Sequence, residues 1–137
     1  MTAKEYLLEI RRYERALSNV KMQSEKLHES FAYLKGVSYD RDKVQTSPTD
    51  TMSEQVSRLI DIERELERAT LEYHTELNKR IKQINGLSKS EYIAILTARY
   101  IKNENFETIS CEINYSYYRT CRMHGDALKE FTEKYLN

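Results

Sequence analysis

A heptad repeat of apolar residues runs through residues 3–34, and it constrains the fold more than any other feature of the sequence. Alternating steps of three and four place ten residues on one face: Ala3, Tyr6, Ile10, Tyr13, Leu17, Val20, Ser24, Leu27, Phe31 and Leu34. The intervening residues are mostly charged, which is typical of a coiled-coil helix, and Ser24 is the one weak position. The repeat leaves two partners equally open: a helix of a second chain, or another helix of the same chain.

A second amphipathic helix is predicted to follow and to end near Ile84. Thr51 and Glu54 have the spacing of a capping box, in which two side chains satisfy the free amides at the start of a helix. The apolar stripe of this helix comprises Val56, Leu59, Ile62, Leu66, Ala69, Tyr73, Leu77, Ile81 and Ile84. Its opposite face is dense in glutamate and arginine. This pattern favours a solvated surface on which ion pairs between residues one turn apart stabilise the helix.

Residues 35–51, with Gly36 and Pro48, interrupt both patterns and are predicted to form a loop. Two long amphipathic helices joined by one loop most simply pair as an antiparallel hairpin. Apolar surface left over on residues 3–34 and 52–84 is then expected to recruit a second subunit. We therefore expect a homodimer or a higher oligomer.

The composition favours an all-α fold, because 3 glycines and 1 proline among 137 residues allow few turns. Lysine plus arginine and aspartate plus glutamate number 22 each, so any binding of nucleic acid must come from a local surface. No apolar run is long enough to cross a membrane, and the N-terminus lacks the apolar core of a secretory signal. Two cysteines are too few for a disulfide framework, so we expect a reduced, cytoplasmic protein that does not bind membranes.

The C-terminal part is predicted to be a separate helical domain, so that residues 1–86 form the hairpin and residues 87–137 form a second domain. Gly86 follows the second helix, and Ser88 with Glu91 forms another capping-box pattern. The next helix directs Tyr92, Ile93, Leu96 and Tyr100 inward and ends near residues 102–105. A short helix, capped by Asn105, and a longer one, capped by Ser116, flank a turn and form a helix-turn-helix pattern. The last helix directs Thr120, His124, Ala127, Leu128 and Phe131 inward.

This helix-turn-helix resembles region 4 of bacterial sigma factors. The residues that match are Ile109, Ser110, Ile113, Ser116, Ala127 and Leu128, without a gap. That family usually has valine where Thr120 stands and often leucine near His124. Most of the chain also resembles the RinA/ArpU-type late transcriptional regulators of bacteriophages and their small phage relatives, through the loop YDRDKVQTSP and the helix RMHGDAL. The resemblance implies a phage-encoded DNA-binding regulator, often of late or packaging genes, acting in the cytoplasm of a bacterial host.

The stretch YSYYRTCRMHG, residues 115–125, is the richest in reactive side chains. Cys111, Cys121 and His124 are three potential zinc ligands, but a structural zinc site needs four and usually a closely spaced cysteine pair. The cysteine spacing is not that of a redox motif either. We therefore expect no metal and no cofactor, with His124 packed in the core and bonded to backbone or to a tyrosine hydroxyl.

The same stretch is predicted to bind double-stranded DNA, because the first two turns of its helix hold no acid before Asp126. Arg119 and Arg122 are candidates for guanine edges or phosphates, since a guanidinium bridges two acceptors. Ser116 caps the helix and is a phosphate candidate, and Tyr117 and Tyr118 are candidates for phosphates or thymine methyls. Ordinary helix packing is the alternative for the tyrosines.

Two other functions stay open at this stage, and neither is enzymatic. The motif could dock on RNA polymerase or another regulator, which the neutral charge favours. The combination of this motif with helical oligomerisation segments is also found in packaging proteins such as small terminase subunits. An enzyme is not expected, because the sequence has no glycine-rich phosphate loop, zinc-protease motif or serine-hydrolase elbow.

Overall fold

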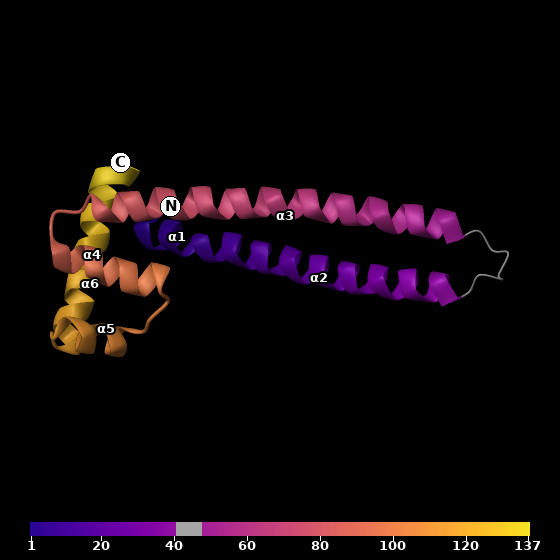
Figure 1. The fold of residues 1–137 in the computed structure, drawn as a ribbon. Helices are drawn as coiled ribbons and strands as arrows, with labels where there is room; N and C mark the ends of the chain where they lie inside the picture. Colours follow the sequence, from indigo (N-terminus) through magenta and orange to yellow (C-terminus); the bar gives the residue numbers. More distant parts are fainter. Residues whose placement is uncertain (41–47) are drawn as a thin grey trace. The chain divides into compact units, whose positions relative to one another are not determined.

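The computed structural model describes residues 1–40 and 48–137, and for residues 37–40 and 48–51 it describes the backbone alone. The described residues form helices and no strand, which confirms the all-α class. The helices are α1 (Ala3–Leu8), α2 (Ile10–Asp40), α3 (Pro48–Asn85), α4 (Ser90–Leu96), α5 (Phe106–Ile113) and α6 (Tyr117–Phe131), with the π-helical segments η1 (Thr97–Ile101) and η2 (Thr132–Leu136) (Figure 1).

The long helices extend further than the sequence predicts. α2 continues to Asp40, beyond Gly36, because one glycine inside a helix costs only about 1 kcal/mol. α3 already begins at Pro48, and proline is well suited to the first helical position, where no amide hydrogen is needed. The predicted loop 35–51 is therefore too long, and the predicted start at Thr51 is wrong. The remainder of that loop, residues 41–47, lies outside the described residues.

The chain divides into two compact units, and the division does not fall at the predicted boundary after residue 86. One compact unit, unit 1, combines Met1–Arg12 with His74–Asn137, and a second, unit 2, comprises Tyr13–Tyr73. The N-terminus and the end of α3 belong to unit 1 because their apolar side chains are buried together with those of the C-terminal helices. The region predicted as a separate domain of residues 87–137 thus shares its core with both.

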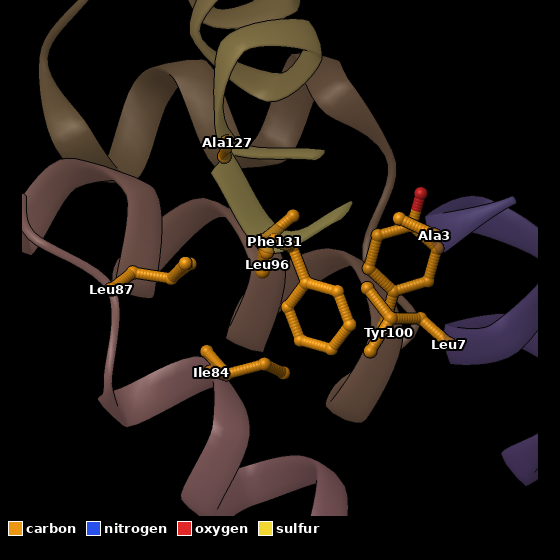
Figure 2. Close-up of a cluster of buried hydrophobic side chains, with 8 residues drawn as sticks. All are labelled: Ala3, Leu7, Ile84, Leu87, Leu96, Tyr100, Ala127 and Phe131. Carbon is orange, nitrogen blue, oxygen red and sulfur yellow. The ribbon is translucent and has the colours of Figure 1, made fainter. Parts of the chain in front are cut away.

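The main core of unit 1 is a cluster from α1, α3, α4, η1 and α6 (Figure 2). Its buried members are Ala3, Leu7, Ile84, Leu87, Leu96, Tyr100, Ala127 and Phe131. Each large apolar side chain that is completely buried contributes about 1.5–3 kcal/mol to folding. A smaller cluster of Ile95, Ala98 and Ile109 packs α5 against α4 and η1. The predicted inward positions of α4 and α6 are confirmed.

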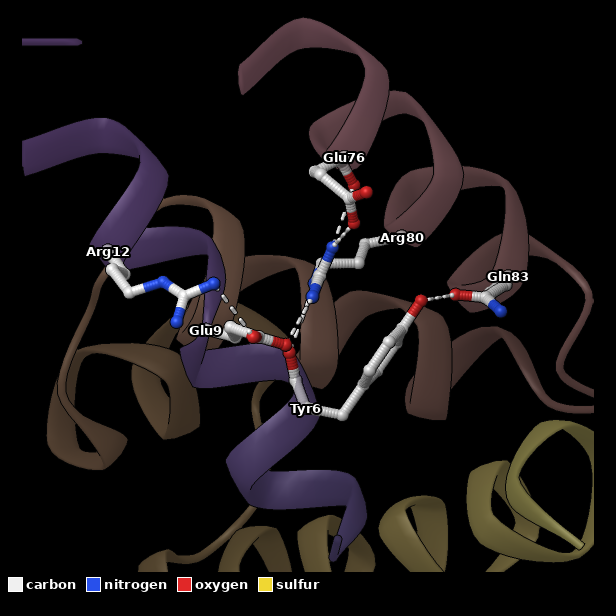
Figure 3. Close-up of polar contacts among 6 residues, drawn as sticks. All are labelled: Tyr6, Glu9, Arg12, Glu76, Arg80 and Gln83. Carbon is white, nitrogen blue, oxygen red and sulfur yellow. Dashed lines mark hydrogen bonds and ion pairs between the residues drawn. The ribbon is translucent and has the colours of Figure 1, made fainter. Parts of the chain in front are cut away.

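A buried arginine joins the start of the chain to the end of α3 (Figure 3). Arg80 is 1 % exposed, and its guanidinium lies 4.2 Å from the centre of the Tyr6 ring. It donates to the Tyr6 carbonyl at 3.0 Å, to a Glu76 carboxylate oxygen at 2.6 Å and to a Glu9 carboxylate oxygen at 3.2 Å. Glu9 also pairs with Arg12 at 3.2 Å. The first two turns of the chain are therefore fixed to α3 by charge as well as by packing.

The capping predicted for the start of α4 is not the one that the structure shows. Ser88 does not cap α4, because its backbone amide and hydroxyl both donate to the Glu130 carboxylate of α6. Lys89 is the N-cap residue and makes no side-chain capping bond. Gly86 follows α3 as predicted but has no positive φ. A Cβ there would collide with the Tyr135 hydroxyl, so a larger residue requires that side chain to shift.

Within unit 2, α2 and α3 contact each other in opposite chain order. His28 Nε2 lies 3.6 Å from a Glu63 carboxylate oxygen, and further along Tyr73 is close enough to Glu14 to be influenced by its charge. Burial raises the pKa of Tyr73, and the Glu14 carboxylate adds to this effect. The heptad positions of α2 from Tyr13 to Leu34 are all buried or partly buried. On α3 the predicted stripe is also covered, except for Val56, which is exposed.

Candidate nucleic-acid interface

Helices α5 and α6 and the three residues between them are defined by local hydrogen bonds. Asn105 caps α5 by accepting from the Thr108 amide at 2.8 Å. Asn114 ends α5 in the left-handed conformation, with φ 60°, which asparagine tolerates better than most residues. Ser116 Oγ then accepts from the Arg119 amide at 3.2 Å and caps α6. Both predicted N-caps are confirmed.

The inner face of α6 is anchored in the core of unit 1. Thr120, Ala127 and Phe131 have no exposed surface. The hydroxyl of Thr120 is satisfied inside its own helix, because it donates to the Ser116 carbonyl at 2.9 Å. This bond accounts for a threonine at a position where the sigma-factor pattern has valine.

His124 is a packed imidazole, as predicted. Its Nε2 lies 2.8 Å from the Tyr100 hydroxyl, and its ring meets the Phe106 ring edge-on at 4.8 Å. Burial, together with the positive charges of Arg99 and Lys4, lowers the pKa of His124 from 6.5 to about 4. The ring is therefore neutral at physiological pH.

The outer face of α6 begins at the exposed residues Ser116–Arg119 and continues to Arg122. Tyr118 is 82 % exposed and Tyr117 48 %. The Arg119 guanidinium lies 4.4 Å from the centre of the Tyr115 ring, which holds it by a cation–π contact. A hydrogen bond with Cys121 raises the pKa of Tyr117.

Four of the five predicted site residues line one groove of about 810 Å³. Its walls are Lys89, Glu91 and Tyr92 near the start of α4, and Tyr115, Ser116, Tyr118, Arg119, Arg122, Met123 and Asp126 in and just before α6. Tyr117 does not line the groove. The α4 residues could not be found from the sequence pattern, because only the tertiary fold brings them next to α6.

The three cations of the groove are not neutralised by pairing. In the described part of the chain, Lys89, Arg119 and Arg122 form no ion pair. Lys89 Nζ lies 5.4 Å from the centre of the Tyr92 ring, an arrangement like that of Arg119 over Tyr115. A guanidinium in this state keeps donors that fit a phosphate or a base edge.

Neither Cys111 nor Cys121 lines the groove. Cys111 is exposed and Cys121 partly buried, and both are free thiols. No group of three or more histidine, cysteine, aspartate or glutamate residues suited to hold a metal occurs among the described residues. Of the three residues considered as zinc ligands, His124 is hydrogen-bonded through its Nε2 to the Tyr100 hydroxyl.

Comparisons with family models, with curated proteins and with solved structures found no match for this chain. In the described residues, no helix is both long enough and apolar enough to span a membrane.

Proposed function

We propose that the protein binds double-stranded DNA with the outer face of α6 and acts as a phage-type transcriptional regulator, of late or packaging genes. The observation that carries this proposal is the division of α6 into two faces. One face is buried through Thr120, Ala127 and Phe131, and the other offers Arg119 and Arg122, which form no ion pair with any residue that the structure describes. A helix held in this way presents the same side chains in the same geometry to every ligand.

The chemistry of the outer face fits the major groove of DNA. The first turns of a recognition helix make the base contacts, and an arginine there can donate two hydrogen bonds to the edge of guanine. Tyr118 has the exposed ring needed to reach a phosphate or a thymine methyl. The amide of Arg119 is bonded to Ser116, so this serine has its hydroxyl oxygen partly engaged and is the weaker of the phosphate candidates.

The balanced charge of residues 87–137 favours binding by more than one copy. Residues 87–137 contain seven lysines and arginines and seven aspartates and glutamates. Electrostatic attraction to DNA scales with the number of phosphates neutralised, so one copy would bind weakly. We propose that the homodimer or higher oligomer forms through residues 3–34 and 52–84. The heptad positions of α2 from Tyr13 to Leu34 are already buried or partly buried within unit 2. The contact would then use outer apolar residues such as Met22 and Leu71, which are 63 % and 70 % exposed.

A mobility-shift assay with Arg119→Ala and Arg122→Ala tests the function. Each variant should weaken duplex binding several-fold at low salt and leave the circular dichroism spectrum unchanged, because both side chains are exposed. Lys21→Ala is the matched control, since it removes one exposed positive charge from unit 2. Unchanged binding by both arginine variants would overturn the assignment of α6.

A second function, docking on RNA polymerase or another regulator, is favoured by a separate observation. Met22, Tyr33 and Leu71 of unit 2 are large apolar residues that are more than half exposed. Exposed apolar side chains favour contact with another protein where they form one contiguous patch. Binding to purified polymerase, together with no duplex shift at low salt, would favour this function over the first. A ring-sized oligomer in light scattering would instead favour a packaging role like that of a small terminase subunit.

A further inference from the structure

The wall of the groove opposite α6 carries a cation that the sequence pattern does not single out. Lys89 lies at the start of α4 and lines the groove together with Arg119 and Arg122. Its side chain caps no helix and forms no ion pair among the described residues, and it lies over the Tyr92 ring at 5.4 Å. We propose that Lys89 binds a DNA phosphate across the groove from Arg119 and Arg122, so that one strand's backbone runs along this groove. This inference rests on the proposed function.

The position of Lys89 relative to α6 is fixed by its neighbours. Leu87 is buried in the main core, and the Ser88 amide donates to the Glu130 carboxylate of α6 at 3.0 Å. Bonds from Ser88 lower the pKa of Glu130, and the charges of Lys134 and Lys89 add to this effect, so Glu130 is ionised and remains a strong acceptor. Lys89 is therefore attached through its backbone to the same helix that carries the two arginines. A phosphate contact made by Lys89 needs little reordering of the chain.

The two acidic residues of the groove restrict what it can hold. Glu91 and Asp126 line it together with the three cations, which leaves a surplus of one positive charge. A small free anion inside the groove would lie near carboxylates as well as cations. An extended polyanion can instead place separate phosphates beside separate cations, so a nucleic-acid strand fits this arrangement better than an isolated phosphate.

The expected contact has a distinct signature in the salt dependence of binding. Each phosphate neutralised by a cation steepens the fall of log K with log salt by about one. Lys89→Ala should therefore reduce that slope by about one and weaken all duplexes equally. Arg122→Ala should weaken some sequences more than others if it contacts a base edge. Lys89→Arg should retain the wild-type slope, because it retains the charge.

Fluorescence anisotropy with a pool of random-sequence duplexes, over a series of salt concentrations, measures these slopes. Lys21→Ala serves again as the control and should leave the slope unchanged. If the wild type binds and Lys89→Ala has the wild-type slope, the phosphate contact is wrong while the proposed function stands. If the wild type does not bind the pool even at low salt, the proposed function fails, and the inference about Lys89 fails with it.

Discussion

Replacement of Arg80 by methionine should destabilise unit 1 more than any single change on the surface of α3. The guanidinium is buried against the Tyr6 ring and donates to Tyr6, Glu9 and Glu76. Methionine fills part of the same volume but cannot donate a hydrogen bond. The change removes a donor from the Tyr6 carbonyl and from both carboxylates, and of these only Glu9 keeps another ion pair among the described residues, with Arg12.

The size of the effect follows from how far those carboxylates can be rehydrated. Removal of one partner from a buried ion pair costs about 3–5 kcal/mol. The side chains of Glu9 and Glu76 are 25 % and 26 % exposed, so water reaches them once the arginine is gone. We therefore expect a loss of about 2–4 kcal/mol, which is a large part of the typical stability of a small domain.

Native-state hydrogen exchange of the α4 and α6 amides measures this loss within unit 1 and does not require the two units to unfold together. Lys82→Met is the matched control on α3, because it removes an exposed positive charge from the same unit. An opening free energy that falls by less than 1 kcal/mol, or equally in both variants, would refute a structural role for the Arg80 network.

Three other changes have defined outcomes. Ser116→Ala should lower stability by about 1 kcal/mol in chemical denaturation, because the N-cap bond to Arg119 is lost. Tyr118→Ala should leave the unfolding midpoint unchanged, because the ring is 82 % exposed, and should weaken duplex binding in anisotropy titrations. The free energy of unfolding, measured at different pH values, should reveal the protonation of His124, whose pKa is lowered from 6.5 to about 4. Between these values the unfolded state binds a proton that the folded state does not, so stability is complete above pH 6.5 and falls toward pH 4. The ring is partly exposed, so the loss should be about 1–2 kcal/mol, and His124→Leu should abolish it.

Local signals in the sequence predicted the helices and two of the four expected N-caps. Asn105 and Ser116 cap α5 and α6 as expected, because an N-cap depends on residues within one turn. The inward faces followed from periodicity in the same way. The predicted loop 35–51 was too long, because Gly36 and Pro48 are compatible with helix where they occur. Gly36 lies inside the long helix α2, and Pro48 is the first residue of α3.

Contacts between distant parts of the chain had no signature in the sequence. Arg80 looks like one more charged residue on a polar helix, and its burial depends on Tyr6 and Glu9 more than 70 positions away. The pairing of Ser88 with Glu130 replaced an expected capping box for the same reason. Of the five predicted site residues, helical phase separated Tyr117 from the rest, and tertiary packing added Lys89 to the surface.

Photo-crosslinking from position 118 tests the central claim most directly. A photoreactive benzoylphenylalanine in place of Tyr118 should form crosslinks to duplex DNA in a mixture with purified RNA polymerase, and the same group in place of Leu71 should not, because that residue lies in unit 2. Crosslinks from position 118 to polymerase but not to DNA would contradict DNA binding by α6.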